Sequence, residues 1–510
     1  MRKTSILILF APKFSQFGCD VGKEYSRRKG GATIHGVCTG PRELAKSIQD
    51  TLGPEAGTFW HLHTEEKSWL SADQAAGEEL SEIDEELGAG TLGRMIVADR
   101  RVGKGFVCGG LCRPDNTGKS ISKRPDILPQ QYILGLYRFL DHVLETTAPD
   151  MVFCYAVAGA PAMMLAKMAQ AREIPFSRIN TVRLGSRFVI DDDPEGRLAC
   201  VARAYWSTQD GGDHEVHAEA KELLESFRRL PTPPEYMRRN YKRLKSQTPL
   251  RMTARAIASS AYHLLATAWY REDRRERIAR AWFESWVSWR RTLGSFPFAA
   301  QPPVGAPFVY FPLHVDPEAS TQVLAPMHTD QLAVIEALAK SAPADMQVVV
   351  KEHAPMLGRR PAGFYRRIRG LPRATLLGPE HNGLFLVERA SIVAVITGTA
   401  AWEAMRLGTP TVVIGESPFL SIKSGVIHEP CLANLSGALL KARESNTASD
   451  DELAKYIAAC LAESFEMKSD LLWGDYTKHE EQVRKTGVKN IVDGILRRER
   501  EQLPSGMKVS

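Results

Sequence analysis

The feature that most constrains this chain is a regular alternation between short apolar runs and longer stretches of helical periodicity. It is clearest between residues 308 and 414. Strands that alternate with helices predict βαβ units, in which a parallel sheet carries helices on both faces. We therefore predict a doubly wound α/β domain in this region. Its expected strands are 308–312, 347–351, 374–377, 392–396 and 410–414, and its expected helices are 329–340, 361–369, 382–389 and 400–407.

Residues 1–205 show the same alternation less regularly. The apolar run at 6–10 follows Arg2 and Lys3, but it is shorter than the core of a signal peptide, so we expect a buried strand there. Single cores stop growing at about 250–300 residues, so a chain of 510 residues with two such regions predicts two domains. The expected strands here are 6–10, 94–98 and 151–155, and the expected helices are 42–52, 130–147 and 161–172.

The stretch between the two regions is basic and has helical periodicity. Residues 221–291 contain 17 Lys and Arg against 7 Asp and Glu. One interpretation is a helical bridge whose charged faces are solvated. The other is a basic amphipathic surface that rests on an anionic membrane or binds an anionic polymer. The aromatic residues that favour the second interpretation are Trp269, Tyr270, Trp282, Trp286 and Trp289.

These patterns predict four segments along the chain. We expect a Rossmann-like domain at 1–205, a basic helical linker or insertion at 206–300, a second Rossmann-like domain at 301–448, and C-terminal helices at 449–510 that wrap the outside or cross back to the first domain. Two such domains that face one another form a cleft, and a small ligand and a second substrate are expected to meet in it.

The composition narrows the class of protein. With 44% hydrophobic and 25% charged residues, the chain is an ordinary globular protein rather than a disordered or disulfide-stapled one. A net charge of +6 is small for this length and does not indicate a nucleic-acid partner. The scattered cysteines predict reduced thiols in the cytoplasm, and Cys108 and Cys112 lack the second ligand pair of a zinc site.

The sharpest candidate site is the turn Thr397-Gly398-Thr399-Ala400, which joins a predicted buried strand directly to a helix. We expect Gly398 to allow a tight turn and Thr399 to cap the helix. Free N–H groups and the helix dipole suit this end to a phosphate. Glu403, one turn further on, could accept hydrogen bonds from ribose or sugar hydroxyls. In the alternative interpretation, the turn merely ends the strand and Glu403 is a solvated helix residue.

Two other loops are expected at the same edge of the second sheet. The strand 347–351 ends at Lys351, and His353 follows it. Either side chain could meet a nucleotide phosphate, and His353 could also donate a hydrogen bond to a sugar hydroxyl or a proton to a leaving phosphate. The alternative is that His353 only makes structural hydrogen bonds. After the strand 308–312, Asp316 and Glu318 are paired carboxylates, of which Glu318 is the preferred acid, base or nucleophile because Asp316 precedes a proline and suits a turn.

In the first domain, loops at 10–22, 99–105 and 155–161 are expected around one crevice. Asp99, Arg100 and Tyr155 are its weaker candidates for contact with an acceptor. The run Asp191-Asp192-Asp193 is interpreted as an exposed turn rather than a metal site. The chain has no Walker loop, Gly-x-Ser-x-Gly or His-Glu-x-x-His motif, so P-loop, α/β-hydrolase and zincin chemistry are disfavoured.

Four pieces of the second region follow one another in order: Phe-Pro-Leu-His-Val-Asp-Pro-Glu-Ala-Ser at 311–320, Val-Lys-Glu-His at 350–353, Gly358 with Phe364-Tyr365, and Thr-Gly-Thr-Ala-x-x-Glu-Ala at 397–404 followed by Gly408-Thr-Pro. On these pieces, the chain from Phe308 through Gly415 resembles the C-terminal half of capsule polysaccharide synthesis proteins, a GT-B-like group that includes retaining Kdo transferases. In that group a His-Pro pair helps to bind the donor nucleotide. Here His353 is present, but Ala354 stands in place of the proline and Pro355 comes one residue late.

The resemblance implies a metal-independent glycosyltransferase with a GT-B-like fold and no bound cofactor. A nucleotide sugar, CMP- or UDP-linked, would lie on the second domain, and a growing surface polysaccharide or a lipid-linked glycan on the first. The protein would be cytoplasmic, with a peripheral position on the inner face of the cell membrane as a further expectation. A nucleotide-sugar epimerase of the same fold and a non-catalytic capsule assembly or export factor are the alternatives.

Overall fold

The structure is a computed structural model that describes residues 3–69, 77–100, 102–114, 128–207, 214–232, 244, 246–265, 271–303 and 305–502. The chain divides into two compact units. Unit 1 comprises Met1–Asp99, Arg124–Trp206 and Ala459–Ser510, and unit 2 comprises Arg100–Lys123 and Ser207–Ala458. The predicted α/β fold class, with two doubly wound sheets, is confirmed. The functional roles assigned to the predicted domains stay predictions.

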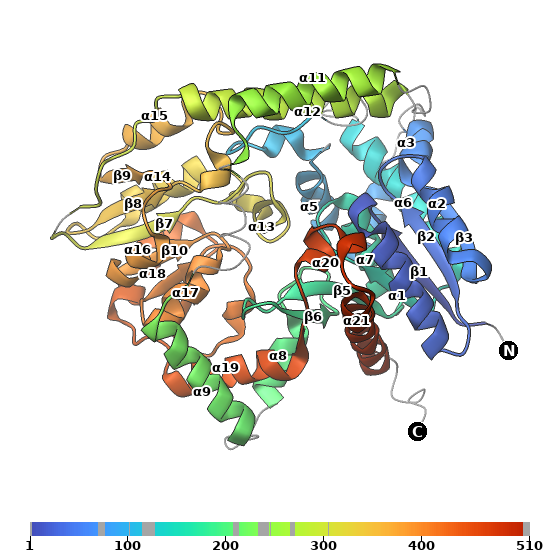
Figure 1. Cartoon of the computed structure of the whole chain (residues 1–510). Coiled ribbons are helices and arrows are strands. Elements are labelled where there is room, and N and C mark those ends of the chain that lie inside the picture. Colours follow the sequence, from blue (N-terminus) through green and yellow to red (C-terminus); the bar gives the residue numbers. More distant parts are fainter. Residues whose placement is uncertain are drawn as a thin grey trace. The chain divides into compact units, whose positions relative to one another are not determined.

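Unit 1 contains a seven-stranded sheet with the order β13-β6-β5-β4-β1-β2-β3 (Figure 1). The five strands from β5 to β3 are parallel, whereas β6 and β13 join at the far edge as antiparallel strands. The bounds are β1 Ser5–Phe10, β2 Thr33–Cys38, β3 Ala56–His61, β4 Met151–Cys154, β5 Phe176–Thr181, β6 Arg187–Asp191 and β13 Ser464–Glu466.

The helices of unit 1 flank this sheet, and β1, β4, α2, α6 and α7 match the predicted elements closely. Residues 94–98 were expected to form a strand, and this is wrong, because they end a helix, α5. The prediction of a loop at 10–22 is also wrong beyond Ser15, where α1 begins. The bounds are α1 Ser15–Arg28, α2 Glu43–Leu52, α3 Leu62–Trp69, α4 Gly77–Leu87, α5 Thr91–Ala98, α6 Leu128–Thr147, α7 Ala160–Ala171, α8 Ala199–Ser207, α20 Asp470–Trp473 and α21 Glu481–Gln502.

The helical conformation of α5 has a local cause. The carboxylate of Asp84 accepts hydrogen bonds from the N–H groups of Gly90 and Leu92, at 2.6 and 2.7 Å, and so satisfies donors at the start of the helix. Leu92, Met95 and Ala98 are buried at a spacing of three residues, which is a helical periodicity. A short apolar run does not by itself distinguish a strand from a buried helix.

Unit 2 contains a six-stranded, wholly parallel sheet with the order β12-β11-β10-β7-β8-β9 (Figure 1). All five predicted strands of this region are confirmed to within one residue at either end, and the sixth strand, β12, was not predicted. The order reverses between β7 and β10, which makes this the topological switch point of the sheet. The bounds are β7 Phe308–Pro312, β8 Gln347–Lys351, β9 Ala374–Leu377, β10 Ile392–Val395, β11 Thr411–Val413 and β12 Val426–His428.

Helices cover both faces of the unit 2 sheet, as the βαβ pattern predicts. Alternate strand residues such as Val309, Phe311 and Val348 form one core with α14, α15 and α18. The other face packs against α16 and α17, where Trp402 is fully buried. The bounds are α9 His214–Arg229, α11 Pro249–Leu265, α12 Arg271–Leu293, α13 Ala319–Gln322, α14 Gln331–Ser341, α15 Phe364–Arg369, α16 Gly383–Arg389, α17 Thr399–Leu407, α18 Leu435–Glu444 and α19 Asp450–Glu463.

The predicted linker is mainly helical where it is described. It contributes α9, α11 and α12, which belong to unit 2. Trp269 and Tyr270, which were singled out in this stretch, lie outside the described residues. No helix in the described ranges is both long and apolar enough to cross a bilayer.

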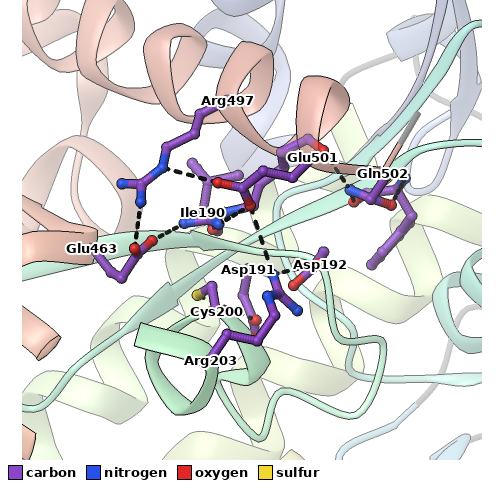
Figure 2. Close-up of polar contacts among 11 residues, drawn as sticks. Ile190, Asp191, Asp192, Cys200, Arg203, Glu463, Arg497, Glu501 and Gln502 are labelled. Atoms are coloured by element: carbon purple, nitrogen blue, oxygen red, sulfur yellow. Dashed lines mark hydrogen bonds and ion pairs between the residues drawn. The ribbon is translucent and has the colours of Figure 1, made fainter. Parts of the chain in front are cut away.

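The C-terminal segment is held to unit 1 by a buried ionic network. Arg498 on α21 pairs with Glu463 and Glu501 and donates to the carbonyl of Ile190 at 2.9 Å. Figure 2 shows Arg497, Glu501 and Gln502 over the end of β6, with Arg203 of α8 beside Asp192. Because Arg498 is 3% exposed and Glu463 is 6% exposed, each ion depends on the other for the solvation that burial removes.

We predict that Arg498→Met destabilises unit 1 by about 3 kcal/mol, because it leaves buried carboxylate and carbonyl oxygens short of a donor. The neighbouring Arg497 shares Glu463 and Glu501 as partners but is 44% exposed. Arg497→Met, the matched control, should cost less than about 1 kcal/mol. Urea unfolding followed by circular dichroism measures both. If both variants lower the free energy of unfolding equally, the burial of Arg498 is not what makes its ion pairs stabilising.

Candidate functional site

The candidate site lies at the switch point of unit 2, where the loops after β7 and β10 are hydrogen-bonded to one another. The Thr397 N–H donates to Nε2 of His314 at 3.3 Å, and the Thr397 hydroxyl donates to the carbonyl of Ser320 at 2.7 Å. Ligands of doubly wound sheets bind outside the carboxyl ends of the strands at this point. The predicted turn 397–400 is therefore in the expected place.

The turn leads directly into α17, but its residues play different parts from those predicted. Gly398 is the N-cap residue and has an extended conformation, with φ −69° and ψ 155°, so Thr399 is the first helical residue rather than the cap. A Cβ on Gly398 would lie 3.2 Å from Nε2 of His314. Glycine is therefore favoured here because a side chain would crowd the imidazole of His314, and not because the backbone is left-handed. Gly398 itself supplies no side-chain cap to α17.

Glu403 and Lys351 are both buried and lie close enough to interact electrostatically. Desolvation raises the pKa of Glu403 to about 7, although the charges of Arg406 and Lys351 oppose the shift. Desolvation also lowers the pKa of Lys351, whose ammonium group donates to the carbonyl of Glu352 at 3.3 Å. The interpretation of Glu403 as a solvated helix residue is therefore wrong, since its side chain is only 8% exposed.

The histidines at the ends of β7 and β8 are neutral at physiological pH. Desolvation lowers the pKa of His314 to about 3 and that of His353 to about 4, and His353 contributes to the shift of His314. Nε2 of His314 accepts a backbone N–H, so its Nδ1 carries the hydrogen. Nδ1 of each ring is buried without a hydrogen-bond partner in the described chain. His353 can therefore offer a hydrogen bond to a ligand but not the positive charge expected for phosphate binding.

A fully buried ion pair, which the sequence analysis missed, holds these loops together. Arg360 donates to both carboxylate oxygens of Glu352, at 2.7 and 2.8 Å, and to the carbonyls of His314 and Gly109, at 2.9 and 2.6 Å. Glu352 also accepts the His353 N–H at 2.6 Å. One guanidinium group thus fixes the backbone around both histidines. A second charged residue directly after Lys351, at the end of a buried strand, was the signal that a buried partner must exist.

The segment around Gly109 forms one wall of this arrangement. The Gly109 N–H donates to the carboxylate of Asp316 at 2.9 Å, and the Leu111 N–H donates to the carbonyl of Arg359 at 2.8 Å. Gly110 lies against the carbonyl of Asp316 so closely that a Cβ has no room there. Burial raises the pKa of Asp316 to about 6. The two glycines of Cys108-Gly-Gly-Leu-Cys112 therefore allow this segment to lie close against the backbone of Asp316.

The two predicted carboxylates in the loop after β7 have different surroundings. Asp316 is buried, whereas Glu318 is exposed and accepts a hydrogen bond from the Ser320 hydroxyl at 3.0 Å. Glu318 also precedes α13 as its N-cap residue. Asp316, which the sequence analysis favoured less than Glu318, is therefore the carboxylate that is packed into the site. A catalytic role for Glu318 stays a prediction.

The boundary between the two units falls among the three acceptor-side candidates. Asp99 ends α5 in unit 1, with its carboxylate 3.6 Å from where a Cβ on Gly159 would be. Tyr155 follows β4 and stacks on Phe14, with ring centroids 4.9 Å apart. Arg100 belongs to unit 2, where its charge lowers the pKa of Asp316. Only Asp99 and Tyr155 therefore share a unit.

No group of three or more His, Cys, Asp or Glu side chains within the described ranges is arranged to hold a metal ion. Asp191, one of the three consecutive aspartates, is fully buried, and Asp193 accepts hydrogen bonds from the N–H groups of Glu195 and Arg197. The predicted turn is present, but the prediction that it is exposed is wrong for these two residues. Metal independence stays a prediction.

No protein-family model matches the chain, and no curated protein matches it by sequence. Among solved structures, the chain is similar to a β-Kdo 2,7-transferase, KpsC of Thermosulfurimonas dismutans, at 11% identity over 70% of this chain and 89% of that chain, with a TM-score of 0.36. It is also similar to UDP-GlcNAc 2-epimerase from Neisseria meningitidis, at 11% identity over 90% and 99% of the two chains, with a TM-score of 0.29. The calicheamicin glycosyltransferase CalG4 matches at 11% identity over 98% and 99%, with a TM-score of 0.25. These likenesses are too weak to bear on function.

We predict that Arg360→Met destabilises unit 2 by about 3–5 kcal/mol, because it leaves the Glu352 carboxylate buried without its counterion. Arg367→Ala is the matched control, since Arg367 is exposed on the following helix and should lose no more than about 0.5 kcal/mol. Thermal and urea unfolding measure both variants. If Arg360→Met lowers the free energy of unfolding by less than about 1 kcal/mol, unit 2 does not depend on this ion pair for its stability.

Glu403→Gln should change how stability depends on pH. A carboxyl group whose folded pKa is about 7, against 4.5 unfolded, binds its proton more tightly when folded, so the wild type loses stability as pH rises from 4.5 through 7. The amide removes this loss, which corresponds to about 3 kcal/mol. We expect the variant to melt at a higher temperature than the wild type at pH 8 but not at pH 5. Parallel melting curves at both pH values would contradict the burial of this group.

Proposed function

We propose that the chain is a glycosyltransferase that moves a sugar from a nucleotide-sugar donor to a growing capsular polysaccharide or lipid-linked glycan. The observation that carries the proposal is the group at the switch point of unit 2. There the start of α17, the buried Glu403 one turn into that helix and the buried Lys351 at the end of β8 belong to one parallel sheet unit. Such an edge suits a ligand that has both phosphates and hydroxyl groups.

In this proposal the donor phosphates lie on the N–H groups of Thr399 and Ala400. Lys351 supplies positive charge, and it does so strongly because it is desolvated. His353, which is neutral, donates or accepts a hydrogen bond, and Glu403 holds ribose or sugar hydroxyls. The same donors stabilise the negative charge that develops on the leaving phosphate as the glycosidic bond breaks.

The remaining roles follow the sequence interpretation. Glu318 would act as acid, base or nucleophile, and Asp99, Arg100 and Tyr155 would contact the acceptor. The donor would be CMP- or UDP-linked, with no metal required. The protein would act in the cytoplasm at the inner face of the cell membrane. The resemblance of residues 308–415 to capsule polysaccharide synthesis proteins supports this choice of substrate class, and the displaced proline at 354–355 is its one departure.

Donor binding tests the proposal. We expect one of CMP, UDP and GDP, or a sugar derivative of it, to stabilise the protein by about 2.7 kcal/mol at a concentration a hundred times its Kd. Lys351→Met and Glu403→Ala should abolish this stabilisation. Glu388→Ala, an exposed acidic residue on α16, is the matched control and should retain it. Thermal-shift measurements with each nucleotide decide between these results.

The outcomes separate the alternatives. Stabilisation by a nucleotide sugar, with the sugar transferred to a glycan acceptor, supports the transferase. Isomerisation of the nucleotide sugar without an acceptor would identify an epimerase instead. If no nucleotide shifts the melting temperature while an anionic glycan does, the donor site is not functional and the transferase proposal fails.

A further inference from the structure

Unit 2 has a helical hairpin, α11 with α12, whose outer face is unusually apolar. Two hydrogen-bonded contacts define how the helices lie together. The indole N–H of Trp282 donates to the hydroxyl of Ser260 at 3.1 Å, and that of Trp289 donates to the hydroxyl of Thr253 at 3.0 Å. The polar edge of each indole is thus turned toward α11, while the rings remain 45% and 37% exposed. Figure 1 shows the two helices running side by side.

A stripe of large aliphatic residues continues this aromatic surface on α11. Leu250, Ile257 and Leu264 are spaced by seven residues and so share one helix face. They are 75%, 56% and 72% exposed. Ile257 and Leu264 lie one turn after Thr253 and Ser260, the residues that hold the indoles, so the stripe borders the tryptophans. On α12, Trp286 and Leu293 extend the exposed face.

Among the described side chains of α11 and α12, the charges are almost all positive. Of the side chains that the structure describes on α11 and α12, the only acidic one is Glu284, and it is paired with Arg113 and Arg359. Arg290 lies 4.8 Å from the ring centroid of Trp286, which places a cation directly on the apolar face. The other arginines described on the two helices are Arg251, Arg255, Arg275, Arg277, Arg280 and Arg291.

We propose that this hairpin face docks on the surface of an anionic lipid bilayer. Leucine and isoleucine side chains would enter the boundary between headgroups and acyl chains, tryptophan rings would lie at the headgroup level, and the arginines would contact anionic headgroups. The charge argues against a second copy of this chain as the occupant, because two such faces would bring like charges together. An anionic polysaccharide matches the charge but leaves the aliphatic stripe exposed to water.

The docking would explain the membrane position given in the proposed function, but the switch-point site contributes no residue to it, so either proposal can fail without the other. The test is co-sedimentation of the whole protein with vesicles of phosphatidylcholine alone or mixed with phosphatidylglycerol. We expect binding to the mixed vesicles, weaker binding to neutral ones, and further weakening by salt. Leu250→Ser/Ile257→Ser/Leu264→Ser should weaken binding by about tenfold or more. Arg251→Gln/Arg255→Gln should weaken it only on anionic vesicles.

The matched control replaces three exposed apolar residues elsewhere in unit 2. Leu230→Ser/Met327→Ser/Leu440→Ser changes side chains that are 71%, 86% and 47% exposed and should bind vesicles as the wild type does. Circular dichroism melting of each variant confirms that it is folded. The proposal is overturned if the hairpin variant and the control bind alike, or if the wild type binds neither kind of vesicle. It is also overturned if sedimentation velocity shows that the hairpin residues mediate dimerisation instead.

Discussion

The candidate site depends on the buried ion pair between Arg360 and Glu352. The guanidinium group reaches the backbone after β7 and the segment at Gly109, and the carboxylate holds the backbone N–H of His353. A buried pair of this kind is costly unless every polar atom is satisfied, and here the arginine makes four hydrogen bonds. We infer that the ion pair serves to fix the loops, because two well-packed apolar side chains in its place could make the fold equally stable.

The electrostatics of the site follow from burial. Desolvation keeps both histidines neutral, brings the pKa of Glu403 close to 7, and makes Lys351 easier to deprotonate. A dianionic phosphate bound beside Lys351 would raise the pKa of Lys351 again, because an adjacent negative charge favours the charged ammonium. Ligand binding and the protonation of Lys351 are thus coupled. Since Arg360 is paired with Glu352, we assign the positive charge that meets the ligand to Lys351 and the start of α17, and the imidazoles contribute hydrogen bonds.

The sequence was sufficient for the fold of unit 2 and for part of its site. Regular βαβ spacing located five strands, and the carboxyl ends of those strands located Lys351, His353 and the turn at Gly398. Arg360 could not be assigned, because its partners lie on segments far apart in the chain and no local pattern brings Gly109 beside residue 316. The error at 94–98 has a similar origin, since the cap that makes α5 a helix comes from Asp84. The unequal burial of Asp316 and Glu318 likewise depends on tertiary contacts.

The most direct test of the account is a crystal structure of the protein with the nucleotide that it binds best. The account predicts a phosphate within hydrogen-bond distance of the N–H groups of Thr399 and Ala400 and of the Lys351 ammonium, with the ribose hydroxyls on Glu403. A nucleotide bound with its phosphates at another edge of unit 2, or on unit 1, would contradict the assignment of this switch point as the donor site.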